Sequence, residues 1–192
     1  LVHASEIWDG IIKDVFKAIP RRKDQKLFVD LADPEKREEA DLRYALHQIG
    51  QMNDYADVIL GLNKKEACEI CSVLGRAHAD CETTNPQELM EYILKKVPVS
   101  TLVVHTAKEA FVGQPGKRII STETPYCEKP MLTTGAGDNF NAGFMLGQMA
   151  GLDVEESLQT AVYNAGYYVR NAGSPDTKEL ITFMKQDEND GA

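Results

Sequence analysis

The feature that most constrains the fold is the alternation of short apolar runs with longer segments that carry apolar residues at helical spacing. Runs of strand length lie at residues 26–31, 57–61 and 101–105. Helical spacing is found between them, for example at residues 6–18 and 85–96. Strands that alternate with helices usually form a mostly parallel sheet covered by helices on both faces. The sequence therefore predicts an α/β fold, as one domain over residues 1–192.

Turn and cap residues locate several element boundaries. Asp33-Pro34 predicts a helix start, with Asp33 as the cap and the proline in the first turn. Asp153 caps a later helix, and Ser174-Pro175 predicts the start of the last one. Residues 110–121 contain two apolar runs on either side of a Gly-Gln-Pro-Gly turn, which predicts a β-hairpin.

Composition indicates a soluble globular protein. Apolar residues make up 43% of the 192 residues and charged residues 27%. The formal net charge of -9 disfavours nucleic acid and anionic membranes as partners. No run reaches the roughly 20 apolar residues of a membrane span, and residues 1–6 lack a signal pattern. We therefore expect a cytoplasmic protein with no nucleic-acid or membrane partner.

Four cysteines allow two interpretations. Cys68, Cys71 and Cys81 form, with His78, the spacing C-x2-C-x6-H-x2-C, which could bind zinc. Alternatively, Cys68 and Cys71 lie on successive turns of a helix that begins near Asn63, as buried free thiols. We favour the second interpretation, because zinc sites of this kind usually occur in chains with few core residues. Disulfides are not expected without a secretion signal.

The stretch TTGAGDNFNAGF at residues 133–144 places two glycines and an acid directly before a helix expected at residues 138–150. Helix N-termini present unpaired N–H groups to anions, and Gly135 and Gly137 let the backbone approach a ligand closely. The stretch is not a dinucleotide fingerprint, because Phe140 occupies the third glycine position, nor a Walker loop, because it has no lysine. It suits a phosphate or a transition-state oxyanion.

Asp138 has two explanations at this level. Aspartate is a common helix-start residue, so it could serve the helix alone. A carboxylate beside an anion-binding loop also suits phosphoryl transfer, where it would accept the proton of an attacking hydroxyl.

These residues resemble the C-terminal motif of the ribokinase-like (PfkB-type) carbohydrate kinase family. The resemblance implies a three-layer α/β/α sandwich, Rossmann-like and mostly parallel. It implies that Asp138 is the catalytic base, that Gly135, Ala136 and Gly137 form the anion hole, and that Thr134 lies on the nucleotide side.

Further stretches extend the resemblance. Residues 57–67 form a strand followed by N-x-x-E, as in the family, which implies that Asn63 reaches toward ATP and that Glu66 places Mg²⁺ through water. A capping box would explain the same pair. Asn164 would approach the adenine, or be a tolerated polar residue on a half-buried helix. Thr106 would also lie beside the nucleotide.

The chain departs from the family pattern at several positions. Leu132 replaces an acid that commonly helps to bind a monovalent cation, so potassium activation is not implied. Ala107 and Ala110 replace two glycines beside the nucleotide, which narrows backbone freedom there. His105 is expected to pack at a strand end. Ala32 replaces an asparagine, and no function is assigned to it.

The resemblance covers only the C-terminal part of the family fold, so the early strands, most sugar contacts and a lid are expected upstream of Leu1. That lid often makes a dimer contact, which implies a possible homodimer. The implied function is ATP-dependent phosphorylation of a sugar hydroxyl. The alternatives are a kinase for a nucleoside or another small alcohol, and a non-catalytic regulatory relative that binds a nucleotide or sugar.

Overall fold

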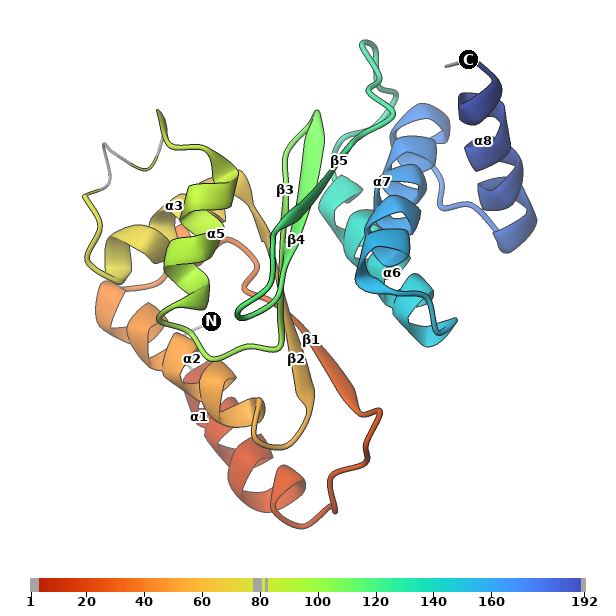
Figure 1. The fold of residues 1–192 in the computed structure, drawn as a ribbon. Coiled ribbons are helices and arrows are strands. Elements are labelled where there is room, and N and C mark those ends of the chain that lie inside the picture. Colours follow the sequence, from red (N-terminus) through yellow and green to blue (C-terminus); the bar gives the residue numbers. More distant parts are fainter. Residues whose placement is uncertain (1–3, 78–80, 82, 191–192) are drawn as a thin grey trace. The chain divides into compact units, whose positions relative to one another are not determined.

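The computed structural model describes residues 4–77, 81 and 83–190 (Figure 1). Its five strands follow chain order in one sheet, β1-β2-β3-β4-β5. The chain forms two compact units, residues 1–104 with 113–119 and residues 105–112 with 120–192. Strands and helices alternate as expected, and the α/β fold class is confirmed.

The first unit combines the early strands with the helices that connect them. A short helix α1 continues into a π-helical segment, and a 3-10 turn precedes the long helix α2. Its elements are α1 (Ala4–Gly10), η1 (Ile11–Phe16), β1 (Lys26–Asp30), η2 (Pro34–Lys36), α2 (Glu39–Met52), β2 (Asp57–Asn63), α3 (Lys64–Val73), α5 (Pro86–Leu94) and β3 (Thr101–His105).

Strands β1 and β2 run parallel, with Lys26 opposite Asp57 and Asp30 opposite Gly61. All five interior residues of β2 are buried, which explains why this strand is a continuous apolar run rather than an alternating one. Because the pair is parallel and in this register, Asp30 and Asn63 lie at the same edge of the sheet. Polar groups at this carboxyl edge face the place where α/β sheets bind ligands.

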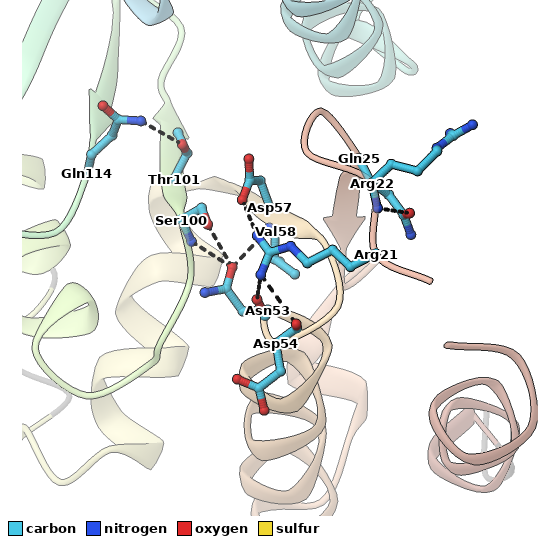
Figure 2. Close-up of polar contacts among 10 residues, drawn as sticks. All are labelled: Arg21, Arg22, Gln25, Asn53, Asp54, Asp57, Val58, Ser100, Thr101 and Gln114. Atoms are coloured by element: carbon cyan, nitrogen blue, oxygen red, sulfur yellow. Dashed lines mark hydrogen bonds and ion pairs between the residues drawn. The ribbon is translucent and has the colours of Figure 1, made fainter. Parts of the chain in front are cut away.

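The opposite ends of β2 and β3 are fixed by Asn53 (Figure 2). Its side-chain oxygen accepts hydrogen bonds from Val58 N at 3.0 Å, Ser100 N at 3.1 Å and Ser100 Oγ at 2.8 Å. The guanidinium of Arg21 donates to the Asn53 carbonyl and pairs with Asp57 at 2.7 Å. These contacts join helix α2 to both strands at the edge away from Asn63.

The predicted helix start at Asp33 is wrong. Asp33 adopts a left-handed conformation, with φ 68° and ψ 73°, and makes no side-chain cap hydrogen bond. Only a 3-10 turn follows, and the α-helix begins five residues after Pro34, at Glu39. The predicted buried face of that helix is correct, since Leu42, Ala45, Leu46 and Ile49 are all in the core.

The second unit begins with a hairpin and continues with three helices. The predicted hairpin is confirmed, because β4 and β5 are antiparallel and Val112 lies opposite Ile120. The elements are β4 (Glu109–Gly113), β5 (Ile120–Glu123), α6 (Ala136–Met149), α7 (Val154–Asn171) and α8 (Thr177–Asp190).

Helices α6 and α7 pack closely because two glycines on α6 lie one turn apart. A Cβ at Gly143 would be 2.7 Å from the Cβ of Asn164, and one at Gly147 would be 2.7 Å from Ser157 Oγ. Any larger residue would push the helices apart. The same helix carries Asp138 in its first turn.

Of the cap residues predicted for the last two helices, one is correct and the other is wrong. Asp153 caps α7 with a reciprocal pair to Glu156, as predicted. The start predicted at Ser174 is wrong, because α8 begins at Thr177 and Asp176 exchanges hydrogen bonds with Glu179 instead.

Cys68 and Cys71 lie on helix α3, which follows the cap Asn63, as the favoured interpretation expects, and the absence of zinc stays a prediction. Cys68, Cys71 and Cys81 are buried and unbridged, and burial, with the neighbouring thiols, raises the pKa of Cys71 to about 12. His78 lies outside the described residues, and within them no group of three His, Cys, Asp or Glu side chains could hold a metal ion. None of the helices in the described ranges is long and apolar enough to cross a membrane.

Candidate active site

The loop at residues 133–138 turns sharply into helix α6. Gly135 is the N-cap and adopts φ 88° and ψ 0°, a left-handed conformation that favours glycine. The Ala136 N–H closes the preceding turn by donating to Thr133 O at 3.1 Å. Helix geometry leaves the next two N–H groups, of Gly137 and Asp138, without acceptors inside the helix. Gly137, a member of the predicted set of Gly135, Ala136 and Gly137, is therefore one of the open donors, and Asp138 adds a second. The assignment of this set to an anion stays a prediction.

Two side chains that the sequence did not single out hold this loop. Asn139 donates its amide N–H to Gly135 O at 2.9 Å, and the Tyr168 hydroxyl donates to Thr134 O at 2.8 Å. Tyr168 also covers Gly135 so closely that a Cβ there would be 2.8 Å from the hydroxyl oxygen. The loop is thus fixed from helix α6 itself and from helix α7.

Asp138 lies in the first turn of α6 and its side chain is exposed. It does not cap the helix, since Gly135 occupies the N-cap position without a side-chain hydrogen bond. The explanation of Asp138 as a helix cap therefore does not apply, and its carboxylate is exposed. Its position beside the open N–H groups fits a group that accepts a proton next to a bound anion.

A mostly apolar pocket of about 360 Å³ lies in the second unit, next to this loop. Ala136, Gly137 and Phe140 form its wall on the α6 side. Other segments that contribute are the end of β3, the stretch after β5 and helix α7, through His105, Thr106, Ala107, Thr124 to Glu128, Pro130, Thr133, Val162, Ala165, Gly166 and Val169. Its size and mostly apolar lining are typical of a site for a small organic ligand or cofactor.

Thr106 lines this pocket, but its hydroxyl organises the β3–β4 turn. It donates to Glu109 O at 3.0 Å and accepts from the N–H groups of Glu109 at 2.9 Å and Lys108 at 3.2 Å. The predicted nucleotide contact of Thr106 stays a prediction. In this structure the Thr106 hydroxyl makes its hydrogen bonds to backbone groups of the turn.

Two other predicted cofactor residues are also engaged locally. Asn164 is buried, and its amide nitrogen donates to Asn139 O at 2.6 Å, which joins α7 to α6. Thr134 is exposed and its carbonyl accepts the Tyr168 hydroxyl. Neither contacts the pocket in the described structure, where neighbouring residues of the same segments form the lining.

In the first unit, Asn63 and Glu66 form a capping box at the start of α3. The Asn63 side chain accepts from Glu66 N at 2.9 Å, and one Glu66 oxygen accepts from Asn63 N at 2.8 Å. The other Glu66 oxygen accepts from Asp33 N at 3.4 Å. The predicted capping box of Asn63 and Glu66 is therefore present. These hydrogen bonds leave further lone pairs on the Glu66 carboxylate.

Glu66 is only 9% exposed and carries a perturbed carboxyl group. Burial raises its pKa above the ordinary 4.5, against the lowering effect of the Asn63 N–H, and the nearby charges of Asp30 and Asp33 raise the pKa further. Asp33 and its neighbour Ala32 both have positive φ, 68° and 49°. Strained backbone and a destabilised carboxylate together are features of functional sites rather than of ordinary helix starts.

The carboxyl edge of β1 and β2 fits a magnesium ion that keeps most of its waters. Mg²⁺ usually binds through one or two carboxylates together with phosphates and water. Glu66 presents a carboxylate with unused lone pairs in a negative environment, as that binding mode requires.

Comparison with known proteins gives a consistent result. The sequence model of prokaryotic ketohexokinase matches residues 3–187. A ketohexokinase of Haloferax volcanii is 28% identical over 160 residues, which is 83% of this chain and 41% of that protein. The adenosine kinase of Saccharomyces cerevisiae is 29% identical over 134 residues, 68% of this chain and 38% of that protein.

Solved structures agree at the level of the fold. The crystal structure of ribokinase from Thermotoga maritima superposes with a TM-score of 0.63 at 21% identity, covering 82% of this chain and 48% of the ribokinase. The chain therefore spans less than half the length of each of these relatives. The expected ribokinase-like fold is confirmed.

Alanine at Gly135 and alanine at Gly137 should have different effects on the stability of the fold. We expect Gly135→Ala to lower the free energy of unfolding by about 1–3 kcal/mol, because a left-handed alanine is strained and its Cβ meets Tyr168. Gly137→Ala should be neutral or stabilising by up to about 1 kcal/mol, since its Cβ meets only His105 at 3.6 Å. Urea denaturation of the full-length variants measures both. Equal losses would contradict the assigned geometry.

The raised pKa of Glu66 predicts a pH-dependent stability. The folded state prefers the protonated carboxyl, so this contribution is complete below the ordinary pKa of 4.5 and is lost as pH rises through the folded pKa. Without Mg²⁺, the stability advantage of Glu66→Gln over the wild type should therefore grow from about pH 4 to about pH 7. Urea titrations across this range test the sign. A constant difference, or one that shrinks with pH, would contradict it.

Proposed function

Because the chain belongs to the prokaryotic ketohexokinase family, we propose that it is the nucleotide-binding and catalytic part of a kinase that phosphorylates a sugar hydroxyl with ATP. The observation that carries the proposal is the first turn of α6, where open N–H groups and the exposed Asp138 lie beside a mostly apolar pocket that Ala136 and Gly137 of the same turn line. An anion site with a base beside it is what transfer of a phosphoryl group to an alcohol requires.

The reaction assigned to these residues is an in-line displacement. The carboxylate of Asp138 accepts the proton of the sugar hydroxyl as its oxygen bonds to the γ-phosphorus of ATP. The bond from that phosphorus to the β–γ bridging oxygen breaks, and ADP leaves with the bridging oxygen. The N–H groups of Gly137 and Asp138 stabilise the charge on the phosphoryl oxygens. The mostly apolar pocket holds the adenine.

Glu66 and Asn63 are assigned to the nucleotide and its metal. Glu66 would hold Mg²⁺ through water, and Asn63 would orient the same edge by keeping Glu66 in its capping box. When bound, Mg²⁺ neutralises charge on the phosphates. The support for this role is the buried, strained and negatively charged edge at which Glu66 lies.

A ketohexose is the first candidate acceptor, since the matching family and the Haloferax relative carry that name. A nucleoside is the second candidate, because the adenosine kinase of yeast matches at similar identity. The residues assigned above belong to the proposed nucleotide side, and the chain spans 41% and 38% of these two relatives, so we assign the choice of acceptor to the parts that it does not span.

Asp138→Asn in the full-length protein tests the assignment of the base. We expect turnover to fall by about 10²–10⁴-fold, because asparagine cannot accept the proton, while the affinity for ATP stays nearly unchanged. Steady-state kinetics and calorimetric titration with Mg-ATP measure the two quantities.

A matched control is Asp153→Asn, which changes an acid at another helix start of the same unit. Asparagine caps as well as aspartate, so this variant should keep normal turnover and stability. Near-normal turnover of Asp138→Asn would show that the base lies elsewhere. A loss in both variants would show that helix stability, rather than proton transfer, is being measured.

A further inference from the structure

We propose that Ser174 is a positioning residue for phosphoryl transfer, which acts through Asn139 on the backbone of the loop at residues 133–138. This inference rests on the proposed kinase function and deepens it, because it concerns the same anion site. Ser174 does not cap the last helix, which begins at Thr177. Its hydroxyl instead donates to Asn139 Oδ1 at 2.7 Å, across 35 residues of the chain.

The hydrogen bond from Ser174 holds the Asn139 side chain in one orientation. An asparagine amide presents a donor on one side and an acceptor on the other. Here the nitrogen donates to Gly135 O at 2.9 Å, while the oxygen accepts the Ser174 hydroxyl. Turning the amide over would place its oxygen against the carbonyl oxygen of Gly135, so the observed orientation satisfies both partners.

The backbone of Asn139 is held as well. Its N–H group donates to Gly135 O at 3.0 Å, in the hydrogen bond with which α6 begins. Its carbonyl accepts from the amide of the buried Asn164 at 2.6 Å. Gly135 O thus accepts from both nitrogens of Asn139, which uses both of its lone pairs. Asn139 therefore joins the glycine loop to helix α7 and to the segment that follows α7.

The orientation of Gly135 O determines where the open donors point. The Gly135 carbonyl and the Ala136 N–H group belong to one planar peptide unit. The N–H groups of Gly137 and Asp138, which we propose for the phosphoryl oxygens, follow in the same helical turn. A small rotation of the first peptide would displace these donors from the phosphoryl group and weaken the stabilisation of its charge.

Ser174→Ala in the full-length protein tests this role. Turnover should fall about fivefold, the value of one neutral hydrogen bond. The KM for ATP and the melting temperature should stay unchanged, because Ser174 is exposed and lies outside the core. The matched control is Thr182→Ala, which removes an exposed hydroxyl that donates to Lys178 O at 2.8 Å within its own helix. That variant should keep the kcat and KM of the wild type.

A double variant tests whether Ser174 acts through Asn139. Asn139→Ala removes the amide between Ser174 and Gly135, so it should lower turnover by more than Ser174→Ala does. Adding Ser174→Ala to it should cause no further loss, because the hydroxyl then has no side chain to orient. Two losses that multiply would overturn the proposal, and so would normal turnover of Ser174→Ala.

A second measurement depends neither on turnover nor on the folding of Asn139→Ala. In full-length protein labelled with ¹⁵N-glycine, Ser174→Ala should shift the backbone amide signals of Gly135 and Gly137. The signal of Gly151, just beyond the other end of α6, should stay in place. Gly135 and Gly137 signals that do not move would contradict the role of Ser174.

The outcomes separate the two proposals. If the wild-type protein is active and Ser174→Ala matches it, the role of Ser174 is overturned while the kinase proposal stands. If the wild-type protein phosphorylates no acceptor, the proposed function is overturned, and the role of Ser174 in phosphoryl transfer with it.

Discussion

Helix α6 begins where Gly135 turns the chain through a left-handed conformation, and the Tyr168 hydroxyl and the Asn139 amide hold that turn at 2.8 and 2.9 Å. The open N–H groups, the exposed carboxylate of Asp138 and the pocket wall at Phe140 all follow from where this helix starts. The close approach of α7 at Gly143 and Gly147 brings Tyr168 over the loop. If an anion binds at this turn, as proposed, its site is organised before the anion arrives.

Much of the fold could be predicted from the sequence, because buried strands and amphipathic helices have distinct periodicities. The continuous apolar run of β2 and the buried face of α2 are as expected. The helix start at Asp33 could not be predicted correctly, since Asp33 has a left-handed backbone and its N–H group donates to Glu66, 33 residues away. Local cap preferences do not include such a partner.

In the candidate site, too, some residues could be identified from the local sequence and others only from the folded chain. The glycine loop and the acid are adjacent in sequence, so a motif could identify them, and so could the pair Asn63 and Glu66. Tyr168 and His105 reach the loop from other elements, and only the folded chain brings them to Gly135 and Gly137. Asn164 illustrates the converse, because its polar side chain joins two helices through Asn139 O. In the first unit, burial raises the pKa of Glu66, and perturbed carboxyl groups of this kind are frequent at functional sites.

The role proposed for this loop and its carboxylate is phosphoryl transfer to an alcohol. The most direct measurement is transfer of labelled phosphate from γ-labelled ATP by the full-length protein, with Mg²⁺, to a panel of ketohexoses, aldoses and nucleosides. If the loop and Asp138 serve phosphoryl transfer, a labelled phosphate ester of at least one acceptor should form, and no transfer should occur when Mg²⁺ is chelated. Tight binding of ATP with no labelled product from any acceptor would contradict it and favour a regulatory nucleotide-binding protein.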